Sequence, residues 1–155
     1  MARLEIIDFS PDYSAAFAQL NREWLEKYFR VEPIDDTVLS DPAATIVAHG
    51  GVILFAKTDD EIVGTAALKH HGDGNFELTK MAVTADRQGT GIGRALLSAV
   101  IARYEAIGGA RLYLESHSSL LPALRLYESA GFVHAAAPAP SEYQRADVYM
   151  VYRPD

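Results

Sequence analysis

One stretch, residues 77–97, limits the possible folds of this chain more than any other. It reads ELTKMAVTADRQGTGIGRALL, an extended apolar run followed by a polar turn with glycines at positions 89, 91 and 93 and then an apolar helix. Glycines let a backbone approach a ligand closely, and the first amides of a helix have no internal partner and lie at its positive dipole end. The turn therefore predicts an anion site, such as one for phosphate.

Two familiar nucleotide-binding turns do not fit this stretch. A mononucleotide P-loop requires Gly-Lys-Ser or Gly-Lys-Thr after its glycines, whereas Gly91 and Gly93 are followed by Ile92 and Arg94. A dinucleotide-binding GxGxxG pattern that starts at Gly89 would need a glycine where Arg94 stands. That pattern also normally opens its βαβ unit, whereas several predicted strands precede this turn.

Residues 88–93, QGTGIG, fit the pattern Q/R-x-x-G-x-G/A. The segment thereby resembles the acyl-CoA pyrophosphate loop of the GNAT superfamily of N-acetyltransferases. Residues 77–83 look like the fourth strand of that family, and residues 124–132, LRLYESAGF, look like its late LY…GF helix end. The spacing between these segments suits one helix and one strand. The resemblance covers residues 52–137 well and the first fifty residues poorly.

The resemblance implies one α/β (α+β) domain over residues 1–155. Its mixed, mostly antiparallel sheet would contain about six or seven strands flanked by helices, and one splayed parallel strand pair would form the acyl-CoA cleft. Short turns between apolar runs independently predict an antiparallel meander, and a crossover helix predicts that the strand after it lies parallel to residues 77–83. The expected strands are 4–9, 52–57, 62–69, 77–83, 111–115, 133–137 and 148–152.

By resemblance, acetyl-CoA is the cosubstrate and no metal is needed. The backbone of Met81, Ala82 and Val83 would hold the pantetheine arm along the open edge of its strand. The pyrophosphate would be held by Gln88, Gly89, Thr90, Gly91, Ile92, Gly93 and Arg94. Arg94 could instead face the solvent. The family often has Asn three residues before the position of Ala123, but this chain has Leu120, which puts one CoA contact in doubt.

Tyr127 and Glu77 are the catalytic candidates. Direct acetyl transfer needs a neutral amine and a proton donor for the departing thiolate. Tyr127 occupies the family's LY position, and an ordinary tyrosine pKa near 10 lies above that of a thiol; the alternative is packing on a helix face. Glu77 could be the base, directly or through water, or could only orient the amine. In a regular strand it shares one face with Met81 and Val83, unless a bulge changes this alternation.

The sequence says less about which residues bind the acceptor amine. Trp24 and Tyr28 end an amphipathic helix and could contact the substrate or belong to the core; Ser116 and His117 are weaker candidates. The acids of residues 31–44 could attract an amine, but we expect them to form a solvated face. His70 and His71 are interpreted as exposed turn residues, because no second ligand cluster accompanies them.

The composition of the chain limits the kinds of ligand that it is expected to bind. Fourteen basic and twenty-one acidic residues give a net charge of −7, which disfavours nucleic acid and modestly favours a cationic substrate. The chain has no cysteine, and its start lacks the pattern of a signal peptide or membrane span, so a cytoplasmic protein is expected. The acceptor would be the amine of a small molecule or a peptide, and a homodimer is possible. The alternatives are a catalytically silent acyl-CoA-binding regulatory module and an unrelated nucleotide binder.

Overall fold

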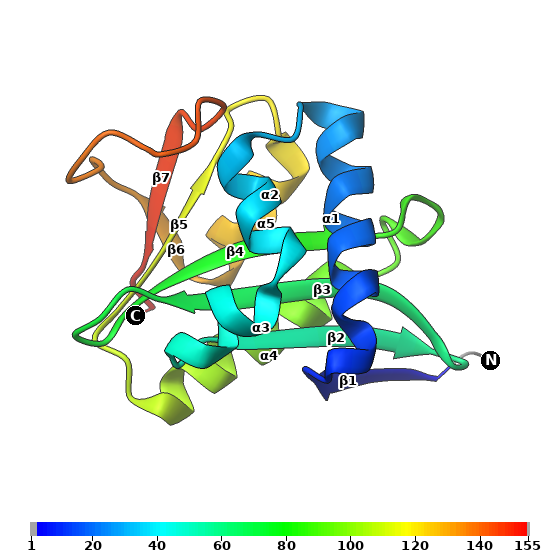
Figure 1. The fold of residues 1–155 in the computed structure, drawn as a ribbon. Coiled ribbons are helices and arrows are strands. Elements are labelled where there is room, and N and C mark those ends of the chain that lie inside the picture. The colour runs from blue at the N-terminus through cyan, green and yellow to red at the C-terminus, as the bar shows by residue number, and fades with distance from the viewer. Residues whose placement is uncertain (1–2, 155) are drawn as a thin grey trace.

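The computed structural model describes residues 3–154, which form a seven-stranded sheet with helices on both faces (Figure 1). The strand order across the sheet is β1-β2-β3-β4-β5-β7-β6. The strands are β1 (Leu4–Asp8), β2 (Val52–Thr58), β3 (Glu61–His70), β4 (Asn75–Val83), β5 (Arg111–Ser116), β6 (Phe132–His134) and β7 (Val148–Tyr152). The helices are α1 (Ser14–Tyr28), α2 (Pro33–Ser40), α3 (Pro42–Thr45), α4 (Ile92–Ile107) and α5 (Leu121–Ala130), with 3₁₀ turns at Pro11–Tyr13, Val47–His49 and Ala85–Arg87.

Strands β1 to β4 form the predicted antiparallel meander. The turn between β2 and β3 places Asp59 and Asp60 at φ +48° and +69°, the left-handed conformations that a tight hairpin turn requires. The next turn uses Gly72 and Gly74, also at positive φ, to return the chain into β4. Aspartate and glycine tolerate this region of the backbone, which is why the sequence predicted both turns.

Strands β4 and β5 are the parallel pair, joined by the crossover helix α4. Their pairing runs from Asn75 opposite Arg111 to Leu78 opposite Leu114 and does not continue beyond Leu78. From there β5 pairs only with β7, on its other side. Figure 1 shows β5 and β7 turning steeply away from β4. The mostly antiparallel sheet with one splayed parallel pair is therefore confirmed.

Two hydrophobic cores hold the helices against the sheet. On one face, α4 and α5 pack through residues such as Leu96, Val100 and Leu124. On the other face, α1, α2 and α3 cover β2 and β3 through Phe17, Leu39 and their neighbours, as the predicted apolar stripe of α1 requires. Helices α1 and α2 stop short of β5 and β7, so that part of the sheet face carries no helix (Figure 1).

A bulge interrupts β4. Between β3 residues Thr65 and Ala67 the pairing advances by two residues on β3 but by three on β4, from Ala82 to Thr79. The extra residue accompanies Lys80, which has a left-handed φ of +54°. Leu78 lies three positions before Met81 and five before Val83, so in a regular strand it would point to the opposite face. Met81 and Val83 nevertheless pack against the same core as Leu78, and the expected shared face of Glu77, Met81 and Val83 is therefore wrong.

Among residues 3–154, no helix is both long enough and apolar enough to cross a membrane. Met1 and Ala2 lie outside the described residues. They belong to the N-terminal segment in which no signal peptide was expected.

Candidate active site

A cavity of about 100 Å³ opens where β4 and β5 separate; we call it the central cavity. Five parts of the chain form its walls. They contribute Trp24 and Phe29 at the end of α1, Glu77–Met81 of β4, Leu114–His117 and Leu120 at the end of β5, Tyr127 of α5, and Tyr143 and Arg145 before β7. The divergence of two parallel strands thus produces a space that an extended ligand can enter.

The glycine-rich turn leads into the first turn of α4. Gly89 and Gly91 have φ of +79° and +90°, which only glycine adopts readily, and the space beside each is open. Gly91 is the N-cap of α4, and no side chain caps the helix there. The first amides of α4 are therefore available to an anion. Gly93 differs, because a Cβ at this position would lie 3.7 Å from Leu126 of α5.

Tyr127 lies on the α5 wall of the central cavity. Its ring packs edge-on against Phe132, with ring centroids 6.1 Å apart, which anchors the side chain in the core. Burial raises the pKa of the Tyr127 hydroxyl to about 12. The hydroxyl therefore keeps its proton at neutral pH and is present as a proton donor.

Glu77 is the buried carboxylate of the site, with 6% of its surface exposed. Its Oε1 accepts a hydrogen bond of 2.9 Å from Nε2 of His71. The prediction of a plain exposed turn histidine missed this contact, because it depends on the β3–β4 register that places His71 over the strand. His70 instead stacks on Phe76, with ring centroids 4.7 Å apart.

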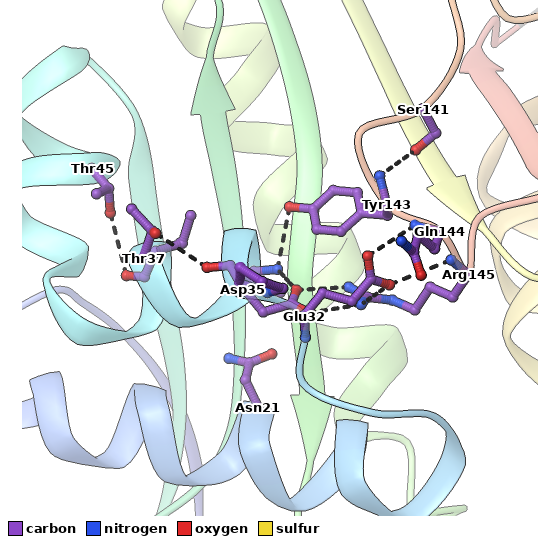
Figure 2. Close-up of polar contacts among 12 residues, drawn as sticks. Asn21, Glu32, Asp35, Thr37, Thr45, Ser141, Tyr143, Gln144 and Arg145 are labelled. Carbon is purple, nitrogen blue, oxygen red and sulfur yellow. Dashed lines mark hydrogen bonds and ion pairs between the residues drawn. The ribbon is translucent and has the colours of Figure 1, made fainter.

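A buried ionic network closes the cavity on the α2 side (Figure 2). Asp35 of α2 is fully buried and accepts hydrogen bonds from Lys80 Nζ at 2.6 Å and from both terminal nitrogens of Arg145, at 2.7 and 2.8 Å. Lys80 Nζ also lies 3.3 Å from the Tyr143 hydroxyl. The β4 bulge turns Lys80 toward Asp35, so the network ties β4 to α2 and to the segment before β7.

Asp35 remains ionised within this network. Burial alone would raise its pKa, but the hydrogen bonds from Arg145 and Lys80 outweigh burial and lower the pKa to about 2. A charge that is buried with partners of opposite sign is costly to disturb, because removal of either side leaves the other uncompensated.

The side chain of Glu32 binds the backbone of the segment before β7. Its carboxylate accepts hydrogen bonds from the amides of Gln144 at 2.9 Å and Arg145 at 3.4 Å. Figure 2 shows Glu32 and Asp35 side by side, with the side chain of Arg145 extending toward both. The expectation of a solvated acidic face was therefore wrong for Glu32 and Asp35, which are 4% and 0% exposed. It holds for Asp36, whose exposed carboxylate pairs with Arg22.

The four substrate candidates separate into two groups. Trp24, Ser116 and His117 line the central cavity. Tyr28 lies outside this lining, exposed and with its hydroxyl 3.5 Å from Oε1 of Gln88. Sequence reasoning missed Tyr143 and Arg145, because their partners Lys80 and Asp35 lie 63 and 110 residues away and no local pattern marks them.

A second, larger cavity of about 430 Å³ adjoins the first; we call it the lateral cavity. Glu77, Glu115 and Tyr143 line both cavities. The lateral cavity extends over the helix-free face of β5 and β7, where Tyr113 and Tyr149 stack with ring centroids 5.4 Å apart. Pro138, Ala139, Pro140 and Glu142, from the segment before β7, also line the lateral cavity. The residues that line both cavities show that the two cavities adjoin where β4 and β5 separate.

No group of three or more histidine, aspartate or glutamate side chains within residues 3–154 could hold a metal ion.

Comparison with known proteins gives one consistent result. The family model described as "Acetyltransferase (GNAT) family" matches residues 13–132. An uncharacterized N-acetyltransferase of Schizosaccharomyces pombe is 28% identical over 122 residues, which cover 75% of this chain and 74% of the relative.

Solved structures show the same fold over nearly the whole chain. A GNAT-family acetyltransferase of Staphylococcus aureus superposes with a TM-score of 0.86 at 18% identity, covering 96% of this chain and 98% of that one. An acetyltransferase of Salmonella typhimurium, solved with its cofactor acetyl-CoA, has a TM-score of 0.77 at 22% identity and covers 99% of this chain and 95% of its own.

Proposed function

The chain belongs to the GNAT family of acetyltransferases, and from this we propose that it moves an acetyl group from acetyl-CoA directly to a primary amine of a small molecule or peptide. One observation carries the proposal: the opening between β4 and β5 contains Tyr127 and Glu77, and the glycine turn with the uncapped start of α4 follows the end of β4. The relative solved with acetyl-CoA supports the choice of cosubstrate.

The residues present fit acetyl-CoA at two points. Beyond Leu78 the edge of β4 has no partner on its β5 side, so the backbone of residues 81–83 can bind the amides of a pantetheine arm. The backbone amides of the glycine turn and of the first turn of α4 can bind the pyrophosphate, since Gly89 and Gly91 leave open space beside them. Acetyl-CoA, when bound, supplies an acetyl thioester.

Glu77 and Tyr127 divide the proton transfers. Glu77 takes one proton from the incoming ammonium, directly or through water, because only the neutral amine has a lone pair. The amine nitrogen then attacks the carbonyl carbon; the C–N bond forms, the C–S bond breaks, and Tyr127 gives its hydroxyl proton to the departing sulfur. After the attack, one of the two hydrogens on nitrogen leaves as a proton to solvent, or to Glu77 once Glu77 has released its first proton, and the other stays in the amide. The phenolate regains a proton from solvent. The products are an amide and free CoA.

The alternative is a silent acyl-CoA-binding module that keeps the fold without turnover. Retention of Tyr127 in the central cavity favours the enzyme.

An acetyl-CoA turnover assay across polyamines, amino acids, aminosugars and peptide N-termini separates the two functions. The proposal predicts equal amounts of free thiol and acetylated amine with at least one acceptor. Binding of acetyl-CoA without turnover of any amine would support the silent module instead.

A further inference from the structure

We propose that the acceptor is a small diamine or polyamine, whose second ammonium group binds in the lateral cavity between Glu115 and Glu142 while its first amine reaches the central cavity. The inference rests on the proposed function and names its substrate class. It is carried by the residues that line both cavities, by the carboxylates of the lateral cavity and by the apolar contact that its tyrosine rings offer.

The position of the lateral cavity allows one ligand to occupy both sites. Glu77, Glu115 and Tyr143 line both cavities, so a chain that enters the central cavity passes these residues. The volume of about 430 Å³ lies in the range of small-molecule sites. Glu77 is buried, and only its Oε1 has a hydrogen-bond partner among residues 3–154, which leaves its second oxygen for a ligand.

Three carboxylates line the lateral cavity: Glu77, Glu115 and Glu142. Burial and the neighbouring charges of Glu77 and Glu142 raise the pKa of Glu115, although a hydrogen bond from Ser141 partly offsets them. Like charges held this close repel one another, and a bound cation relieves that repulsion.

The positive groups of the cavity do not cancel this charge at the proposed position. Arg111 and Glu115 are four residues apart on β5, which separates their Cα atoms by about 13 Å. The Arg111 guanidinium donates a hydrogen bond of 2.6 Å to the Tyr149 hydroxyl, at the far end of the cavity. Lys69 lies opposite Glu77 in the strand register, and His71 hydrogen-bonds to Glu77. The charge of His71 also acts to lower the pKa of Glu115, but burial and the two neighbouring glutamates keep that pKa raised.

The remaining walls suit an alkyl chain that carries ammonium groups. The stacked rings of Tyr113 and Tyr149 and the ring of Tyr143 offer apolar contact to the methylene groups of such a chain. Arg111 already lies over the Tyr149 ring at 5.7 Å, and Lys80 and Arg145 lie over the Tyr143 ring at 4.7 and 4.6 Å. The attraction for the second ammonium group therefore comes from the carboxylates and not from these rings. An acceptor with a carboxylate at this position would meet Glu115 and Glu142 directly.

The test compares diaminobutane, butylamine and aminobutanoate, which share a four-carbon chain and differ in the charge at one end. We expect kcat/KM to be about tenfold or more higher for diaminobutane than for butylamine, and lowest for aminobutanoate, because one ion pair in a partly enclosed site changes affinity by about a factor of ten. This preference should shrink as salt is added, since salt screens the charges.

Glu115→Gln and, separately, Glu142→Gln should lower kcat/KM for diaminobutane, and the ratio of kcat/KM for diaminobutane to that for butylamine should fall about tenfold. Glu142 is exposed, so its variant should fold even if the Glu115 variant does not. Glu61→Gln is the matched control: it removes the same charge from an exposed position outside both cavities and should change neither substrate.

Equal kcat/KM for butylamine and diaminobutane, or unchanged diamine turnover in Glu142→Gln, would overturn the substrate assignment while leaving acetyl transfer intact. A peptide with lysine beside its free N-terminus that reacts better than diaminobutane would overturn the choice of a small molecule. Turnover of none of these amines would contradict the proposed function together with this inference.

Discussion

The role of Glu77 can be isolated because the β4 bulge removes it from the face of Met81 and Val83 without removing it from the cavity. If Glu77 accepts the amine proton, activity should rise with pH through an ionisation that Glu77→Gln abolishes or displaces, while acetyl-CoA affinity changes little. The measurement is kcat/KM against pH, with the melting temperature taken on the same preparation.

Two other outcomes would reassign Glu77. An unchanged pH profile beside a lowered melting temperature would make it structural, and an unchanged profile with weaker acceptor binding would make it an anion that attracts the amine. His71→Gln is the matched variant, because it removes the partner at 2.9 Å and keeps the carboxylate.

Asp35 should control stability in a narrow acid range. Its pKa is about 2 in the folded protein against an ordinary value of 3.8, so the ionised form favours folding. That contribution is fully present above about pH 4 and is lost as pH falls through about 2. We expect Asp35→Asn to lower the free energy of unfolding by about 3 kcal/mol at pH 7, because Lys80 and Arg145 lose their counter-charge.

The difference between wild type and Asp35→Asn should shrink between pH 4 and pH 2, measured by urea unfolding. Asp36→Asn is the control on the next residue: its carboxylate is exposed on the surface and should matter by less than about 1 kcal/mol. A difference that persists undiminished to pH 2 would show that Asp35 is not held ionised as described.

The two ends of α4 allow a test of the CoA site, in which a glycine at the end of the helix serves as the control for a glycine at its start. Gly91 and Gly108 bound this helix, both have left-handed φ, and both have open space where a Cβ would lie. Valine at either position should therefore cost similar stability, about 1 to 3 kcal/mol. Only Gly91→Val should also weaken CoA binding, by about tenfold or more, because it disturbs the backbone that faces the pyrophosphate.

Calorimetry of CoA binding at a temperature where both variants are folded distinguishes these effects. Equal CoA affinity in Gly91→Val and Gly108→Val would remove the pyrophosphate from this turn.

The sequence predicted these elements closely because their signals are local. Apolar alternation and aspartate or glycine turns located β2, β3 and β4, and the expected strand at 148–152 coincides with β7. The bulge escaped prediction for a physical reason: its left-handed residue is Lys80, whereas sequence signals for that conformation come from glycine, asparagine or aspartate. Its cause lies in tertiary structure, where Lys80 meets Asp35.

At the scale of the whole molecule, the site combines a predictable half and an unpredictable half. The glycine turn, Glu77 and Tyr127 belong to contiguous motifs that could be compared with a family. The cavity wall formed by Tyr143 and Arg145 depends on Arg145 meeting Asp35 of α2, 110 positions away, and on Tyr143 meeting Lys80 of β4, 63 positions away. A charge and a tyrosine in a loop carry no pattern that identifies such partners, so the single sequence could not reveal the lateral cavity.

We infer that the turn at α4 and the two cavities serve one reaction at Tyr127. Tyr127→Phe tests it, since this change keeps the ring packed on Phe132 and removes only the hydroxyl. With the best acceptor of the amine panel, we expect acetyl-CoA affinity to survive and single-turnover acetyl transfer to fall by roughly 10²- to 10⁴-fold. Because the Tyr127 pKa is about 12, this difference should persist from pH 7 to 9. Full single-turnover transfer in a folded Tyr127→Phe variant would contradict the account.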